Sequence, residues 1–231
     1  MVEQIAIAGG EARLNDLATR LSLNKSTLHG LLNTLVALGY VNRHGLKYTL
    51  GLRLRSVSLS LADVEARIHA RFYPALKRFA EIAQENSYLI VPGGVRGGVC
   101  ICAVDADGAS LPAYSGTDEW GLTTSAAGRV LLAHDLSLMR SLRKANKIAQ
   151  SLEADLRSIA MKGFALDLGS EGASNHSLAI PLHGPDGQVV AALTMVAASK
   201  ALDEVALVEL AQRLKLDAQR TGWRGDSTIH A

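Results

Sequence analysis

Two short amphipathic segments, a tight turn between them and a hairpin after them constrain the fold of this chain more than any other feature. Leu14–Leu21 places apolar residues at positions i, i+3, i+4 and i+7, which is typical of an amphipathic helix. The turn at 22–24 ends in Asn24, a good N-cap for a second amphipathic helix that stops at Gly39. Alternating apolar residues over 40–50 then predict two short strands. Residues 1–51 are therefore predicted to form a winged helix-turn-helix.

Polar residues gather where such a fold would meet DNA. In a helix-turn-helix the second helix enters the major groove and presents its N-terminal residues to the base edges. The hairpin tip is placed to reach a phosphate or the minor groove. The candidate DNA-binding residues in these two places are Lys25, Ser26, Thr27, His29, Asn33, Arg43 and Lys47. The alternative interpretation is an ordinary helical pair with a solvated basic face.

Charge is distributed unevenly along the chain. The formal net charge is +2 over the whole sequence. Residues 1–55 contain seven Lys and Arg against three Asp and Glu, hence +4, which leaves −2 for the remainder. Positive charge concentrated in this way favours binding to a polyanion.

The rest of the chain alternates between helical and strand patterns. Apolar residues recur every two to four positions over 52–72, which predicts a linker helix that packs on a partner, and Pro74 is expected to open a separate helix up to residue 85. Strands are expected at 88–91, 98–104, 177–182 and 188–196, and helices at 124–132, 136–145, 152–162 and 202–216. This mixed order, with hairpin-like strand pairs, predicts an α+β domain with an antiparallel sheet flanked by helices.

Three stretches, in order, resemble the isocitrate lyase regulator (IclR) family of bacterial transcription factors. They are LNKSTLHGLLNTLVALGYV with KYTLG in 23–51, LTTSAAGRVLLA at 122–133, and GFALD with LAIPLHGPDGQVVAALTM in 163–195. The chain departs from the family at Asn24, where Pro is usual, at Gly30, where Arg or Lys is frequent, and at Arg129, where Lys is usual. Gly30 removes a DNA contact, which affects the operator sequence rather than DNA binding itself.

The resemblance implies three parts along the chain, each with its own function. It implies a winged helix-turn-helix over 1–51, a linker helix over 52–73 and a GAF-like effector-binding domain over 74–231. It also implies a homodimer, or a dimer of dimers, on a roughly palindromic operator in double-stranded DNA. The function that follows is a ligand-responsive transcriptional regulator, a repressor rather than an activator, which is modulated by a small, carboxylate-bearing organic effector.

The effector site is carried over from the family residue by residue. The implied effector-binding residues are Ser125, Ala126, Asp167, Ser177, Ala179, Thr194 and Val196. Two strands and a helix start would offer hydroxyls and free backbone N–H groups to an anion. Asp167 opposes a bare anion, which favours a ligand that also bears a hydroxyl or oxo group. The alternative is that these polar residues only satisfy nearby backbone.

Other classes of function fit the sequence less well. The chain lacks the G-x-S-x-G, P-loop and H-E-x-x-H motifs, so no enzyme, cofactor or metal site is predicted. Cys100 and Cys102 are expected to point to the same side of a strand as inert thiols. No signal peptide or membrane span is expected, which places the protein in the cytoplasm. The alternative function is a small-molecule-binding or catalytic protein whose basic N-terminal head makes protein contacts.

Overall fold

The computed structural model describes the chain except residues 113–119, 146–147, 170–174, 199–201, 222 and 224–231. The chain forms two compact units, an N-terminal unit of Met1–Ala66 and a C-terminal unit of Arg67–Ala231. The boundary between them falls inside one long helix, α4 (Arg53–Ala83). The predicted three-part division at residues 51 and 73 stays a prediction.

The N-terminal unit contains the predicted helix-turn-helix and hairpin. Its elements are α1 (Val2–Ile7), β1 (Glu11–Arg13), α2 (Leu14–Leu21), α3 (Lys25–Ala37), β2 (Val41–His44) and β3 (Lys47–Leu50). The three strands form an antiparallel sheet in the order β1-β3-β2. Its core is a cluster of buried side chains that includes Ile5, Leu17, Leu28, Leu32 and Tyr48. The sequence does not predict β1, because a three-residue strand leaves no periodic signal.

A six-stranded antiparallel sheet forms the centre of the C-terminal unit, as the α+β prediction requires. Its strands are β4 (Ser87–Pro92), β5 (Gly98–Val104), β6 (Ser110–Leu111), β7 (Ala165–Asp167), β8 (Asn175–His183) and β9 (Val189–Ala198). They lie in the order β6-β5-β4-β9-β8-β7. A 3-10 turn, η1 (Gly94–Arg96), joins β4 to β5.

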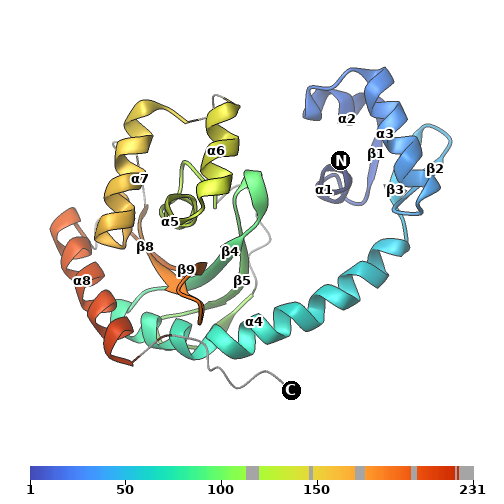
Figure 1. The fold of residues 1–231 in the computed structure, drawn as a ribbon. Coiled ribbons are helices and arrows are strands. Elements are labelled where there is room, and N and C mark those ends of the chain that lie inside the picture. The colour runs from blue at the N-terminus through green and yellow to red at the C-terminus, as the bar shows by residue number, and fades with distance from the viewer. Residues whose placement is uncertain (113–119, 146–147, 170–174, 199–201, 222, 224–231) are drawn as a thin grey trace. The chain divides into compact units, whose positions relative to one another are not determined.

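Helices cover both faces of this sheet (Figure 1). On one face the C-terminal half of α4 and α8 (Glu204–Thr221) pack on residues such as Leu89, Leu178 and Leu193. On the other face lie α5 (Ala126–His134), α6 (Leu136–Lys144) and α7 (Gln150–Lys162). We call these the α8 face and the α5 face.

Helix α4 corrects one prediction. Pro74 does not open a new helix, because α4 continues through it without interruption. A proline inside a helix costs about 3 kcal/mol, since it removes an N–H donor and crowds the preceding turn. Phe72, Leu76 and Phe79, on both sides of Pro74, are all buried in the α8-face core. Each contributes about 1.5–3 kcal/mol when buried, so packing outweighs the local penalty.

The prediction that Cys100 and Cys102 point to the same side is wrong. A β-bulge shifts the register of β4 and β5, so that Cys102 lies opposite Leu89 and Cys100 lies opposite Ile90. Cys102 is therefore part of the α8-face core with Leu89, whereas Cys100 packs against the α5-face core with Ile90. The extra residue, Ile101, reverses the alternation of side chains along the strand.

An ion pair ties α4 to α8 within the C-terminal unit. Arg78 donates from Nε and Nη2 to the two oxygens of Asp217, at 3.1 and 2.9 Å. Asp217 also accepts a hydrogen bond from Trp223 Nε1 at 3.2 Å, and the Trp223 ring meets Phe79 edge to face. The hydrogen bonds and positive charge of Arg78 lower the pKa of Asp217 below its ordinary value.

Acid should therefore remove the stabilisation that this pair provides. Because the folded-state pKa of Asp217 is lowered, the stabilisation is complete above the ordinary carboxylate pKa and is lost as the pH falls through the lowered value. Asp217→Asn should lower the melting temperature at neutral pH, and its difference from wild type should shrink between about pH 5 and pH 2. Thermal melts followed by circular dichroism measure this. Glu209→Gln, on the exposed side of the same helix, is the matched control, and a pH-independent difference for Asp217→Asn would contradict the assignment.

Candidate DNA-binding surface and effector site

The start of α3 is exposed and held in place by a cap. Asn24 has extended backbone angles, and its side chain accepts a hydrogen bond from the backbone N–H of Thr27 at 2.7 Å. Lys25, Ser26 and Thr27 are exposed, whereas Leu28 is fully buried in the core of the unit. The buried leucine fixes the helix, so its polar first turn faces outward.

One turn further along α3, His29 and Asn33 form a pair. His29 Nδ1 and the side-chain nitrogen of Asn33 lie 3.2 Å apart, at the i, i+4 spacing of neighbours on a helix. His29 is half-buried and Asn33 is exposed. Gly30 lies between them with open space around it, since a Cβ there would meet nothing within 4 Å. The exposed surface of α3 thus continues from the first turn into a hydrogen-bonded polar pair.

The β2–β3 hairpin carries the remaining predicted DNA-binding residues. Arg43 is exposed, its Nε donates to the carbonyl oxygen of Gly45 at 3.1 Å, and its guanidinium lies 5.8 Å from the centre of the Tyr48 ring. Lys47 is exposed and pairs with Glu11 of β1 at 2.5 Å. The sequence does not predict that Glu11 pairs with Lys47, because the two residues are 36 positions apart. Exposed ion pairs contribute about 0–1 kcal/mol, so Lys47 can exchange Glu11 for a phosphate at little cost.

The predicted effector residues on the sheet lie in two cross-strand rows. Asp167, Ser177 and Val196 are opposite one another on β7, β8 and β9. Ala179 and Thr194 form part of the next row. Ala179 is part of the α5-face core and Val196 packs against it, so the rows face α5.

Ser125 and Ala126 form the N-terminal end of α5, which packs on the same face. The hydroxyl of Ser125 accepts from Gly128 N at 2.9 Å and donates to the carbonyl of Gly121 at 3.0 Å. The first N–H groups of a helix have no acceptor within it, and this cap satisfies only Gly128. Among the described residues, the backbone N–H groups of Ala126 and Ala127 therefore have no acceptor at this buried helix start, where partial positive charge favours an anion.

The structure distinguishes between the hydroxyl groups. Thr194 is fully buried, and its hydroxyl donates to the carbonyl of Leu178 at 2.9 Å, so its proton is already used. Ser125 is likewise committed to its cap. Ser177 is half-buried between Asp167 and Val196, so its hydroxyl is the most accessible of the three for a hydrogen bond to a ligand.

Arg129 is a functional candidate that the effector prediction did not include. Its Nη2 donates to the carbonyl of Leu166 at 2.6 Å and lies 3.8 Å from Asp167, while Nη1 bonds to Asp155 at 3.1 Å. The side chain is 17% exposed, so it joins α5, α7 and β7 beneath the surface. Its position next to Asp167 offsets the negative charge of that carboxylate.

Trp120 carries a second feature, which the sequence does not show. Its ring is 5% exposed and lies against Tyr88, with centroids 5.3 Å apart. Among the residues that the structure describes, Trp120 Nε1 has no acceptor. A buried donor without a partner costs about 1–3 kcal/mol, and a ligand oxygen would recover part of that cost.

The histidines near this region have other partners. His176 Nδ1 is hydrogen-bonded to the carbonyl of Leu202 at 2.9 Å, and the ring of His183 meets that of His134 edge to face. Within the described ranges, no three His, Cys, Asp or Glu side chains are grouped to hold a metal ion.

Comparison with protein families and curated proteins relates both regions to regulators. Residues 2–45 match the model of the IclR helix-turn-helix domain. The HTH-type transcriptional regulator XynR of Escherichia coli (strain K12) is 24% identical over 222 residues, which are 89% of this chain and 86% of that protein. The glycerol operon regulatory protein of Streptomyces griseus is 29% identical over 190 residues, covering 77% and 74%.

Solved structures share the fold at lower identity. A putative IclR transcriptional regulator from Silicibacter sp. TM1040 has a TM-score of 0.63 at 19% identity and covers 98% of this chain and 96% of its own. An IclR homolog from Microbacterium hydrocarbonoxydans, complexed with 4-hydroxybenzoate, has a TM-score of 0.54 at 20% identity, with 91% and 92% coverage. These similarities extend over both units of the chain.

The N-cap of α3 gives a direct test of how the DNA-facing surface is held. Asn24→Ala removes the acceptor for Thr27 N and should destabilise the N-terminal unit by about 1 kcal/mol. Asn24→Asp keeps a side-chain oxygen in the same place and should stay close to wild type. Chemical denaturation followed by the amide signals of residues 1–50 measures the effect. Equal stability of Asn24→Ala and wild type would show that the cap does not fix this helix.

Proposed function

We propose that this chain is a transcriptional regulator of the IclR family and a ligand-responsive repressor of a roughly palindromic operator. The observation that supports DNA recognition best is the exposed polar first turn of α3, set on the buried Leu28. The proteins to which the chain is similar are regulators. The proposal therefore assigns it no catalytic step and places it with DNA in the cytoplasm. Among the described residues, none of the helices has the length and apolar character needed to cross a membrane.

In the proposed complex, α3 lies in the major groove. Ser26 and Thr27 contact base edges or phosphates, and His29 with Asn33 contacts bases one turn further along. Lys25 at the helix start, and Arg43 and Lys47 on the hairpin, neutralise phosphates. Phosphate contacts fix position and base contacts confer sequence preference.

A second copy of the chain is the proposed partner of α4. Val57, Leu61 and Val64 are all exposed in the N-terminal half of this helix, at the spacing of a coiled-coil seam. Such a stripe is unfavourable in water and favours association. A homodimer, alone or as a dimer of dimers, would place two α3 helices on the two halves of the operator.

The proposed effector is a small organic acid that also bears a hydroxyl group. Its carboxylate would accept from the Ala126 and Ala127 N–H groups and from Trp120 Nε1, and its hydroxyl would meet Asp167 and Ser177. Ala179, Thr194 and Val196 would form the floor of the site. The Microbacterium homolog is complexed with 4-hydroxybenzoate, a molecule with both groups.

Substitutions on α3 and the hairpin should separate affinity from sequence preference. Lys25→Ala and Arg43→Ala should each weaken binding across all sequences and lower the salt dependence by about one counterion, because each removes a phosphate contact. Thr27→Ala and His29→Ala should change the preferred operator. Fluorescence anisotropy with the gene's own upstream DNA and with unrelated DNA, over a range of salt, measures both effects.

The matched control for these variants is Lys144→Ala, which removes a positive charge from an exposed site in the C-terminal unit. It should leave binding unchanged. If all four substitutions left affinity and preference unchanged, α3 would not be the recognition helix.

Effector binding should depend on Ser177. With 4-hydroxybenzoate and related hydroxy acids as probes, a ligand at one hundred times its Kd should stabilise the protein by about 2.7 kcal/mol. Ser177→Ala should weaken the best probe about tenfold, since a lost hydrogen bond is worth about 1–1.5 kcal/mol. Ser141→Ala, on the exposed side of α6, is the control. Thermal shift against ligand concentration gives the affinities, and equal values for both variants would remove Ser177 from the site.

A further inference from the structure

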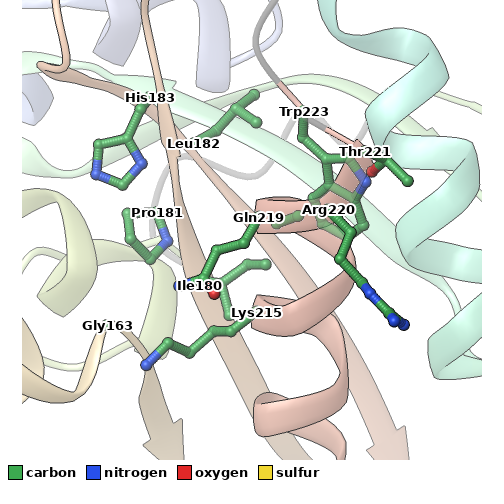
Figure 2. Close-up of a pocket in the computed structure, with 11 residues that line it drawn as sticks. Gly163, Ile180, Pro181, Leu182, His183, Lys215, Gln219, Arg220, Thr221 and Trp223 are labelled. Atoms are coloured by element: carbon green, nitrogen blue, oxygen red, sulfur yellow. The ribbon is translucent and has the colours of Figure 1, made fainter.

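A cavity lies beside the edge of β8 in the C-terminal unit, apart from the predicted effector residues. Its volume is about 600 Å³, and it is bounded by β8, by Gly163 at the end of α7 and by the last two turns of α8 (Figure 2). This volume is typical of small-molecule sites, which run from about 300 to 1,000 Å³. None of the seven predicted effector residues lines it.

The cavity exists because β8 is longer than its neighbour. β7 pairs with β8 only at residues 177–179, so the strand edge from Ile180 to His183 has no partner strand among the described residues. Pro181 lies on this edge and has no N–H to offer a further strand. Gly163 ends α7 in the left-handed conformation, and even a Cβ there would lie 3.1 Å from Lys215 Cε. Space therefore remains between the strand edge and α8.

One wall of the cavity is apolar and rigid. Ile180 and Leu182 are buried residues of the α8-face core that border the cavity. Trp223 forms the end of the wall and is held by its hydrogen bond to Asp217 and its edge-to-face contact with Phe79. The apolar part of a ligand can thus bind here without the entropic cost of ordering the cavity wall.

The polar part of the lining is cationic. Lys215, Arg220 and His183 line the cavity together with Gln219 and Thr221, and no Asp or Glu is among the described residues that line it. Figure 2 shows Lys215 and His183 on the same side of the cavity, whereas Arg220 extends away from them. A ligand's negative charge would therefore meet Lys215 and His183 rather than Arg220.

Lys215 also has a structural role at the end of α7. Its ammonium donates to the carbonyl of Lys162 in the last turn of α7, where a positive charge complements the helix dipole. An ammonium has three N–H donors, so two remain for another acceptor. The structural role thus positions the charge at the cavity and leaves part of its hydrogen-bonding capacity free.

We propose that this cavity is a second ligand site, which binds a medium-chain organic carboxylate with its chain against Ile180, Leu182 and Trp223 and its carboxylate at Lys215. The site is separate from the effector site proposed above, because none of the residues proposed for that site lines the cavity. A bound chain would touch Trp223, which contacts α4 through Phe79. Ligand binding would therefore change the contacts of α4, the helix that continues into the N-terminal unit.

Fluorine NMR of the full chain labelled with 5-fluorotryptophan tests the proposal. The sequence has two tryptophans, Trp120 in the α5-face core and Trp223 at the cavity, so each site has its own resonance. Trp223→Phe assigns the two signals. Decanoate should shift the Trp223 resonance saturably, whereas equal concentrations of acetate and decanol should not, because acetate lacks the chain and decanol lacks the charge.

Variants locate the binding within the cavity. Ala218→Leu fills the cavity and should abolish the shift, and Lys215→Met should weaken decanoate binding at least tenfold. Lys215→Arg keeps the charge and should restore affinity to within a few-fold of wild type, even if Lys215→Met folds poorly. Arg213→Met removes a charge from α8 away from the cavity lining and should bind decanoate as wild type does. The proposal is overturned if decanoate leaves the Trp223 signal unmoved, if decanol acts as strongly, or if Ala218→Leu binds equally well.

Discussion

Burial of the six-stranded sheet on both faces is the constraint on which the rest of the C-terminal unit depends. Strands covered on two sides must be apolar on two sides, and any polar group among them needs a partner. Ser87 and Thr194 are both fully buried, and each donates its hydroxyl proton to a nearby carbonyl. The structure thus tolerates polarity in this sheet only where a hydrogen bond offsets the loss of water.

Polar groups and strand edges that depart from this rule of pairing and burial are the candidates for functional sites in the C-terminal unit. Trp120 Nε1 is buried without an acceptor among the described residues, next to a helix start whose cap satisfies Gly128 alone. At the edge of the sheet the departure is geometric, because β7 is too short to cover β8. One site is therefore defined by unsatisfied donors and the other by an uncovered strand edge. These different origins are the reason that we propose a hydroxy acid for the first and a longer apolar chain for the second.

The N-terminal unit could be predicted almost in full, because its signals are local. The cap at Asn24, the period of α2 and the glycine at the end of α3 each act within a few residues. The pairing of Lys47 with Glu11 depends on β1, a strand whose position is set only by contact with β3. In the C-terminal unit, the bulge at Ile101 and the passage of α4 through Pro74 are decided by packing across the sheet. The same holds for the sites. The row from Asp167 to Val196 follows from family motifs, but two features become visible only in the structure: Trp120 Nε1, which has no acceptor among the described residues, and the charges around Arg129.

Helix α4 shows how the two halves of such a chain can depend on one another. Its C-terminal half is fixed by Phe72, Leu76 and Phe79 in the core and by Arg78 on Asp217. Its N-terminal half exposes Val57, Leu61 and Val64. A helix propagates cooperatively, because each added residue makes a bond to the turn before it. A change in packing at the buried half therefore alters the cost of holding the exposed half helical, and a partner helix on that stripe alters the buried half in return. The ligand response and the pairing that we propose would both act on this one helix, and by linkage each would then shift the other by the same free energy.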